Sequence, residues 1–457
     1  MVESRDFQAA TKSMPTDLRR SMSLRHAAAI VVGTILGASI FLQPSEISRL
    51  VPSTHGLLLV WLGAGALTFC GALVCAELAA AFPETGGIYV FLKKIFSPAV
   101  GFLWGWAMFW SMHSGIIAAL ATILGRYTAY FVPLGDGGQR AVAVTAILAL
   151  SGINYLSIKP GSVLQVALTT AKLVAIAAMV LLIFAFGGRA HHEMASASHA
   201  EQTVTLAAYG LAIAAGLFAF GGWHMVTYTA GETRDPERTI PRALLIGTVV
   251  VTVCYVLLNA GYLYVLPVSE VARSTRVAAD AVERVLGTRA GGAIAAVVIL
   301  STLGSLNGVV LAGPRVYYAM AQDGLAFHWL GAVHPRRRTP HLAIAAQALW
   351  SSILVATNTY RELFTRVVYT EWLFFALLAA GLFVLRRRGD YHPSFLARGY
   401  PVVPLLFIAA ASGIALNQIW ANPRGSAIGL GLILLGLPVY FVWSHQRSRE
   451  DMADADH

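Results

Sequence analysis

Long apolar segments follow one another along almost the whole chain, with short polar segments between them. Twelve of them are long enough to cross a lipid bilayer, which takes about 20 residues of α-helix, although the ninth is short. They span residues 27–50, 56–82, 99–131, 141–158, 160–186, 205–230, 243–266, 291–320, 342–357, 362–385, 400–419 and 426–444. The pattern predicts an all-α polytopic membrane protein. Its even number of spans places both termini on the same side of the membrane.

Composition agrees with this prediction and excludes several other classes of protein. Charged residues make up 12% of the 457 residues, and the mean hydropathy is +0.65. Soluble domains carry about 25% charged residues, so a soluble enzyme, a disordered chain and a disulfide-rich secreted domain are excluded. The net charge of +10 can indicate nucleic-acid binding. In so apolar a chain it indicates basic cytoplasmic loops, and we expect no nucleic-acid partner.

Lysine and arginine gather on one side of the predicted topology. The two tails and the loops on their side contain 20 of the 33 basic residues. The positive-inside rule assigns this side to the cytoplasm. We therefore expect cytoplasmic tails at 1–26 and 446–457 and one membrane domain at 27–445. The protein would reside in the inner or plasma membrane.

Two loops on the opposite side have distinct compositions. Residues 267–290 place apolar side chains at helical spacing but carry too many charges to span a membrane, which predicts a short external helix. Residues 187–204 are rich in Gly, Ala and Ser, which predicts a flexible loop. His191 and His192 in this loop resemble a pair of metal ligands. A solvated loop is the favoured interpretation, and we expect no metal site.

Small residues interrupt two predicted spans near their middle. Gly37, Ala38 and Ser39 lie in the first span, and Gly221 and Gly222 lie in the sixth. Glycine disfavours a helix interior by about 1 kcal/mol relative to alanine, and paired small residues are where helices open. Either cluster alone also suits close helix packing. Together they occupy corresponding positions in two halves of five spans, which is typical of inverted-repeat transporters with a mid-membrane site.

An opened helix exposes backbone groups of both polarities. The freed N–H groups lie at the positive end of a helix dipole and suit a carboxylate, whereas the freed carbonyl groups suit an ammonium. A zwitterionic amino acid carries both groups, so the protein backbone alone can bind its main chain. The two breaks therefore predict amino acid transport by alternating access.

These segments also resemble a known family. GTILGASIFLQP resembles the first-helix signature of the amino acid–polyamine–organocation (APC) superfamily, and LFAFGGWHMVTYTAGETRDPERTIPRA resembles the sixth-helix region of its L-type amino acid transporter branch. The resemblance is collinear from about residue 24 to 385. It implies the five-plus-five inverted-repeat (LeuT-like) fold, with discontinuous helices 1 and 6. The repeats would cover about 27–186 and 205–385, and two further helices would cover 400–444.

The resemblance implies a substrate site between the two breaks. The substrate carboxylate would contact backbone amides in the first break, and its amino group would contact carbonyls in both. Phe218 would be an aromatic gate over the substrate. Ser39 stands where the family usually has glycine, so the pocket is expected to be tighter there. The implied substrate-binding residues are Ile35, Gly37, Ala38, Ser39, Phe218, Gly221, Trp223, His224 and Glu371.

Two ionisable residues lie deep inside predicted spans. A charge at mid-bilayer costs about 2.5–3.5 kcal/mol on insertion scales, and such residues usually face a cavity or a partner. In the family, a lysine at the place of Lys172 replaces a sodium ion, and we expect it to tie the first helix to the eighth through Ser305 and Asn307. Glu371 is either a protonated residue bonded to another helix or part of the pocket wall. The resemblance favours the wall.

Further polar residues leave alternatives open. His224 is either a pocket residue or a neutral core residue, and we interpret His113 as structural. Two mid-span histidines also suit a haem or quinone oxidoreductase, but a second pair is lacking and we expect no cofactor. Glu77, Glu232 and Arg315 lie toward cytoplasmic helix ends, where they form either the ion pairs of an inner gate or solvated ends.

Taken together, the sequence predicts a permease, not an enzyme. The favoured function is sodium-independent exchange of neutral L-amino acids, and the alternative is a proton-coupled symporter of cationic or other amino acids. Animal relatives are disulfide-linked to a glycoprotein through a cysteine in an external loop. Cys70, Cys75 and Cys254 all lie in apolar segments, so we expect no such partner.

Overall fold

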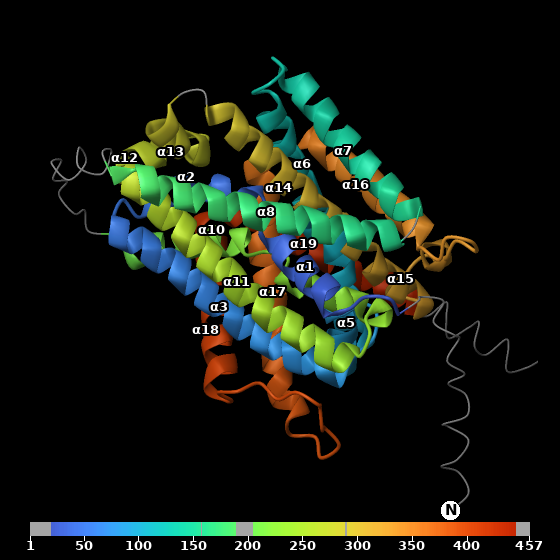
Figure 1. The fold of residues 1–457 in the computed structure, drawn as a ribbon. Coiled ribbons are helices and arrows are strands. Elements are labelled where there is room, and N and C mark those ends of the chain that lie inside the picture. The colour runs from blue at the N-terminus through green and yellow to red at the C-terminus, as the bar shows by residue number, and fades with distance from the viewer. Residues whose placement is uncertain (1–19, 157, 189–203, 288–289, 445–457) are drawn as a thin grey trace, which may run out of the picture.

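The described part of the chain is a helical bundle without β-strands. In the computed structural model it comprises residues 20–156, 158–188, 204–287 and 290–444 (Figure 1). Most of the predicted tails, together with His191 and His192, lie outside these ranges. The elements are α1 (Leu24–Ile35), η1 (Ala38–Phe41), α2 (Gln43–Leu50), α3 (Thr54–Ala81), α4 (Ile88–Ile95), α5 (Pro98–Ala107), η2 (Met108–Met112), α6 (His113–Thr128), α7 (Asp136–Leu156), α8 (Ile158–Phe186), α10 (Leu206–Ala219), η3 (Trp223–Glu232), α11 (Pro236–Val265), α12 (Val268–Arg273), α13 (Val277–Leu286), α14 (Gly291–Ala312), α15 (Pro314–Gln322), η5 (His328–Gly331), α16 (His341–Thr357), α17 (Tyr360–Leu385), α18 (Val402–Ala421) and α19 (Pro423–Leu434).

The chain is an integral membrane protein. Within the described ranges, nine helical segments are long and apolar enough to cross a membrane. They coincide with nine of the twelve predicted spans. The other three predicted spans are helical as well: α16 and the Thr370–Leu385 part of α17 are apolar but shorter, and α7 is not among the nine. Twelve spans therefore stay a prediction.

The prediction of one external helix at 267–290 is wrong, because two short helices, α12 and α13, occupy this segment. The chain is extended at Ser274, between them. The Ser274 hydroxyl accepts a hydrogen bond from the Arg276 backbone amide at 3.0 Å and donates to Asp280 at 2.5 Å. Local bonds of this kind compete with helix formation, and sequence periodicity does not reveal them.

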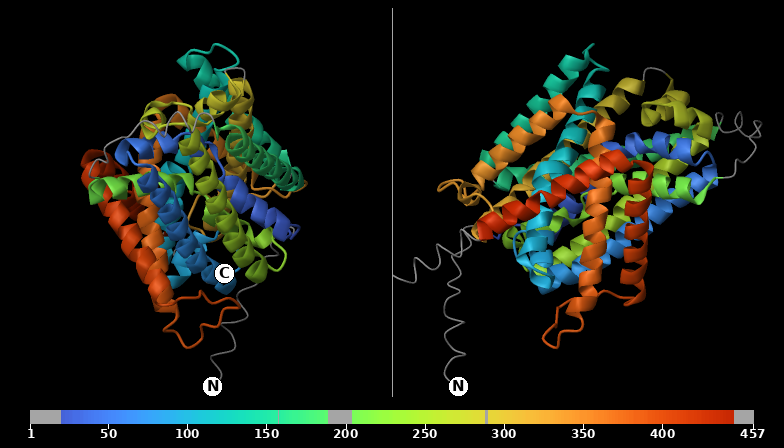
Figure 2. Two further views of the ribbon diagram at one scale, coloured as in Figure 1. Left: turned by 60° about the vertical axis from the view of Figure 1, so that its left-hand side comes forward. Right: turned by 180° about the vertical axis from the view of Figure 1, so that it is seen from behind.

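The centre of the bundle is built around α1. Four longer helices contact it or its continuation: α8, α11 and α14 pack on α1, and α6 packs on η1. In Figure 1, α8 crosses in front of α14, α3 and α11 run beside one another, and α17 and α18 form a further pair. The second view in Figure 2 shows α7 and α16 side by side at the margin. All residues of α1 from Ala29 to its end are buried, so its polar groups need protein partners.

Both predicted helix interruptions are present. The first helix stops at Ile35, turns through Leu36 and Gly37, and resumes as η1 and α2. The second stops at Ala219 and resumes as η3. Gly222, at the start of η3, has φ +96°, and a Cβ there would lie 3.0 Å from Thr34 Cβ. Glycine is required because it alone adopts this backbone freely and permits so close an approach.

One tyrosine connects the two breaks. Tyr255 is fully buried in α11, and its hydroxyl oxygen lies 2.6 Å from the Ile35 carbonyl oxygen and 2.9 Å from that of Ala219. These residues end α1 and α10, where carbonyl groups lack the usual intrahelical donors. The single hydroxyl hydrogen thus serves two helix ends, and Tyr255 holds the breaks side by side.

We predict that Tyr255→Phe destabilises the protein by about 1–2 kcal/mol, because buried carbonyl groups lose a hydrogen-bond donor. The measurement is the apparent free energy of unfolding of the purified protein in a detergent titration. Tyr262→Phe is the matched control. Tyr262 lies in the same helix and is equally buried, but its hydroxyl has no hydrogen-bond partner among the described residues. Equal losses in the two variants would show that the bridge contributes nothing.

Candidate substrate site

A small cavity lies between the two helix breaks. Its volume is about 30 Å³, whereas one water needs about 10–15 Å³ by this measure. The space therefore holds about two waters and no amino acid. Its lining residues are Thr34, Ile35, Gly37, Ser39, Ile116, Leu120, Leu217, Phe218, Ala219, Gly221, Glu371 and Trp372. The cavity is too small for an amino acid in this conformation, and one would fit only if the surrounding helices moved.

Most of the predicted site residues meet at this cavity. The six that line it come from three separate parts of the chain, and they are Ile35, Gly37, Ser39, Phe218, Gly221 and Glu371. Ala38 contributes the first residue of η1, next to this lining. The first N–H groups of a helix lack intrahelical partners. The start of η1 therefore presents donors beside the lining residues.

Trp223 and His224, which were predicted to contact the substrate, lie outside the lining of this closed cavity. Both are buried, and neither belongs to the cavity lining. The His224 ring packs on the ring of Phe375, with centroids 5.0 Å apart, and on that of Trp104 at 5.9 Å. The left-handed turn at Gly222 redirects the chain, so that these side chains pack against α5 and α17. His224 is thus enclosed by aromatic rings.

Half of the cavity lining was not predicted. These residues are Thr34, Ile116, Leu120, Leu217, Ala219 and Trp372. Those next to the breaks or to Glu371 follow directly from the predicted site. Ile116 and Leu120 lie one turn apart in α6, whose residues are mostly buried and apolar. Periodicity marks no face of such a helix, so the sequence carries no signal for these two residues.

The Lys172 ammonium donates hydrogen bonds to carbonyl groups that the first break leaves without helical partners. It is 1% exposed, and its ammonium donates to the carbonyl oxygens of Gly33 at 2.9 Å and Leu36 at 2.8 Å. Its third bond, 2.9 Å long, goes to Ser305 Oγ, which itself reaches the same two carbonyls. An ammonium has three donors, and all three are used. Lys172 therefore ties α8, α1 and α14 together, as predicted.

Asn307 does not take part in this tie, and its predicted pairing with Lys172 is wrong. The Asn307 amide donates to Gln165 Oε1 at 3.0 Å and accepts from Asn154 at 3.0 Å. Residues two positions apart on an α-helix point about 200° away from each other. Asn307 therefore faces away from the lysine that Ser305 meets, and it joins α14 to α7 and α8.

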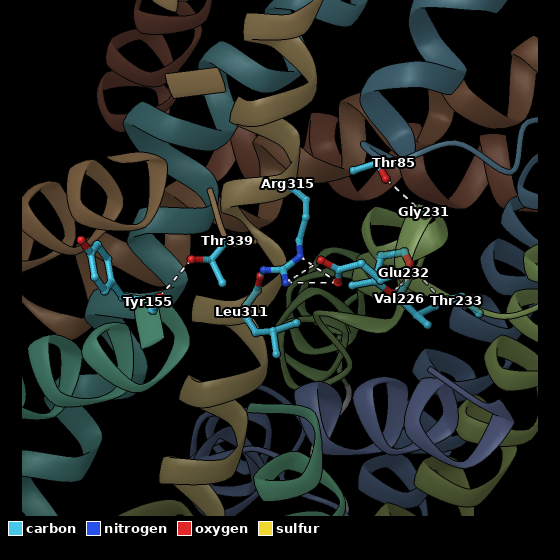
Figure 3. Close-up of polar contacts among 10 residues, drawn as sticks. Thr85, Tyr155, Val226, Gly231, Glu232, Thr233, Leu311, Arg315 and Thr339 are labelled. Carbon is cyan, nitrogen blue, oxygen red and sulfur yellow. Dashed lines mark hydrogen bonds and ion pairs between the residues drawn. The ribbon is translucent and has the colours of Figure 1, made fainter. Parts of the chain in front are cut away.

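A buried ion pair lies at the far end of η3. Glu232 and Arg315 are 0% and 2% exposed, and their closest N–O distance is 3.0 Å (Figure 3). Arg315 also contacts the Leu311 carbonyl. Gly231 donates to Thr85 Oγ1 at 3.1 Å. Ion pairs, not solvated ends, are therefore present at these residues.

Glu77 is the second buried carboxylate with an arginine partner. It is fully buried and accepts from Arg386 at 2.6 and 2.9 Å and from the Ala397 backbone amide at 2.6 Å. The bond to Glu77 raises the pKa of Arg386, which keeps the guanidinium charged. The connection between α17 and α18 is thus anchored on α3.

The remaining polar groups do not form a metal centre in the described ranges. No group of three or more His, Cys, Asp or Glu side chains there is arranged to hold an ion. His113 is buried, with Nε2 2.8 Å from the Val309 carbonyl oxygen. It joins α6 to α14, which agrees with a structural role.

Comparison with known proteins gives consistent matches along the chain. Residues 22–443 match the family described as amino acid permease. The serine/threonine exchanger SteT of Bacillus subtilis (strain 168) is 30% identical over 93% of this chain and 97% of its own. The large neutral amino acids transporter small subunit 2 of Oryctolagus cuniculus is 30% identical over 97% and 85%, and the human cystine/glutamate transporter is 28% identical over 93% and 85%. The chain therefore belongs to the amino acid permease family of the APC superfamily, and it is a transporter, not an enzyme.

Proposed function

We propose that the chain is a sodium-independent exchanger of neutral L-amino acids that works by alternating access in the inner or plasma membrane. The observation that carries this proposal is the Lys172 ammonium, which occupies the carbonyl groups of the first helix break. These oxygens are the ligands that a hard cation such as sodium would need. A fixed positive charge there repels a sodium ion and makes it unnecessary.

The proposed architecture is a twelve-helix, five-plus-five inverted repeat. Its support is the position of the two breaks, which interrupt the first helix and the sixth predicted span, five spans later. The repeats would cover about 27–186 and 205–385, and helices within 400–444 would complete the fold. In such transporters the substrate site lies at mid-membrane between the broken helices. The closed cavity between the two breaks supports this assignment.

The chemistry of the cavity favours a neutral substrate. The substrate carboxylate would bind amides of the first break, near Gly37, Ala38 and Ser39. Its amino group would bind carbonyls of Ile35, Phe218 and Gly221. In the closed conformation the carbonyl of Ile35 accepts from Tyr255 and that of Phe218 accepts from the Gly221 amide. The side chain would contact apolar residues of α6 and α10. These residues are Ile116, Leu120 and Leu217.

The alternative is proton-coupled symport, and Glu371 is the observation that favours it. Glu371 is the one carboxylate among the described residues that line the cavity, and it is 6% exposed. A carboxylate that takes up and releases a proton there would couple transport to pH. A cationic side chain would use the same carboxylate. We favour exchange because the relative with 97% of its length covered is named an exchanger.

We propose that the chain works without a disulfide-linked partner. Cys70 and Cys75 lie in α3 and Cys254 lies in α11. All three are within segments that can cross the membrane. The sequence therefore contains no cysteine in a predicted external loop.

The test of the proposed function uses purified protein in proteoliposomes loaded with labelled L-serine. Efflux should require L-serine or another neutral amino acid outside, and replacing sodium by choline should leave the rate unchanged. Efflux into buffer without amino acid, driven by an imposed pH gradient, would support the symporter instead.

Phe218→Ala should lower exchange at least tenfold, because Phe218 lines the cavity as the proposed gate. The matched control is Phe184→Ala, at an exposed aromatic residue of α8.

We propose that the Glu232–Arg315 pair closes the cytoplasmic side of the site, because it locks η3 to α15. Arg315→Met should destabilise the protein by about 3–5 kcal/mol, since it leaves the Glu232 charge buried without its partner. Adding Glu232→Gln should recover part of this loss. Free energies of unfolding of the two single variants and the double variant give the coupling energy. Additive effects would show that the two side chains do not interact.

We propose that both termini lie in the cytoplasm, following the distribution of basic residues. Single cysteines at Thr275 and Arg336, both exposed, test this in a chain whose three native cysteines are replaced. An impermeant thiol reagent applied to intact cells should label Thr275→Cys. Arg336→Cys should react only after permeabilisation. The reverse pattern would invert the topology.

A further inference from the structure

An apolar groove runs between α7 and α16 on the surface of the bundle. These helices lie side by side in both views (Figures 1 and 2). The groove has a volume of about 450 Å³. Its lining includes the small residues Ser151, Gly152, Ala345 and Ala348, together with Leu148 and Leu349. Leu148 is 53% exposed and Leu349 is 64% exposed, so the groove opens away from the protein.

The length of the groove matches one leaflet of a bilayer. It extends along α7 from Val144 to Tyr155. Eleven residues of α-helix at 1.5 Å per residue span about 16 Å. The hydrocarbon core of a bilayer is about 30 Å thick, so one leaflet contributes about 15 Å. A lipid acyl chain lying parallel to α7 therefore fits the groove from end to end.

Positive charge stands at the Tyr155 end of the groove. The guanidinium carbon of Arg337 lies 4.9 Å from the centroid of the Tyr155 ring, and Arg336 beside it is exposed. Thr339 Oγ1 donates to the Tyr155 carbonyl oxygen at 2.9 Å (Figure 3), which fixes this segment against α7. No carboxylate in the described ranges pairs with Arg336 or Arg337.

We propose that this groove binds one anionic phospholipid. An acyl chain lies between α7 and α16, and the phosphate is held by Arg336 and Arg337 at the mouth. Guanidinium groups bind phosphate oxygens in a bidentate manner, and basic pockets between membrane helices suit anionic headgroups. Tyr155 lies at the end of α7, and aromatic side chains are enriched where membrane helices reach the headgroup region. A second copy of this chain would suit the groove less well, because it would have to place negatively charged side chains next to Arg336 and Arg337.

The test is native mass spectrometry of the full-length protein with phosphatidylglycerol or phosphatidylcholine of identical acyl chains. The wild type should retain one phosphatidylglycerol and release phosphatidylcholine. Arg336→Gln with Arg337→Gln should weaken phosphatidylglycerol binding about 25-fold, taking roughly fivefold for each basic residue near an anionic surface. The matched control is Arg234→Gln with Arg238→Gln, which removes equal charge from exposed residues elsewhere and should bind as the wild type.

The groove itself is tested by filling it. A Cβ added at Gly152 would meet no atom within 4 Å, so Gly152→Leu occupies the groove without a clash and should abolish retention of phosphatidylglycerol. The control is Gly413→Leu in α18, where space is equally open. Three outcomes would overturn the proposal: equal retention of the two lipids, equal loss in the controls, or wild-type binding by Gly152→Leu. A dimer that Gly152→Leu disrupts, without selective lipid retention, would assign the groove to a second copy instead.

Discussion

A single lysine ammonium binds two of the backbone carbonyl groups that the first helix break leaves without helical donors. Opening a helix inside a membrane costs several kcal/mol for every backbone polar group left without a partner. Lys172 places three donors against this break, and Ser305 adds its hydroxyl to the same two carbonyls. Without these donors the interruption at Leu36 and Gly37 would be unfavourable. The cavity between the breaks therefore adjoins backbone carbonyl groups that are bound by a side chain from α8.

The same bonds constrain how the site opens. Lys172 links α1 to α8 and α14, and Tyr255 links the end of α1 to the end of α10. Both breaks are therefore held to helices that cross near the centre of the bundle. The bonds of Lys172 and Tyr255 do not reach the continuations beyond the breaks, α2 on one side and η3 on the other. The closed cavity of about 30 Å³ is the state in which both continuations are docked.

Much of this arrangement followed from the sequence, and the part that did not has a physical cause. The breaks were predictable because glycines in an apolar run disfavour a continuous helix. The buried Lys172 and Glu371 were recognisable as ionisable residues in apolar segments. Of the two α14 residues predicted to pair with Lys172, Ser305 does so and Asn307 does not, because the two side chains point in different directions. The position of His224 depended on the turn at Gly222, whose φ of +96° no sequence pattern states. Tyr255 was missed because a tyrosine in an apolar helix is common, and only tertiary packing shows that its hydroxyl bridges two carbonyl groups.

The anchor at Glu77 has a consequence for the size of the transporter. Arg386 and Ala397, which satisfy this buried carboxylate, belong to the connection that leads into the last two helices. A chain shortened to its first ten predicted spans, ending at residue 385, would leave Glu77 inside α3 with neither its guanidinium nor its amide donor. The desolvated charge would then oppose insertion and folding of α3. The connection that contains Arg386 and Ala397 is thus needed to keep this buried carboxylate paired.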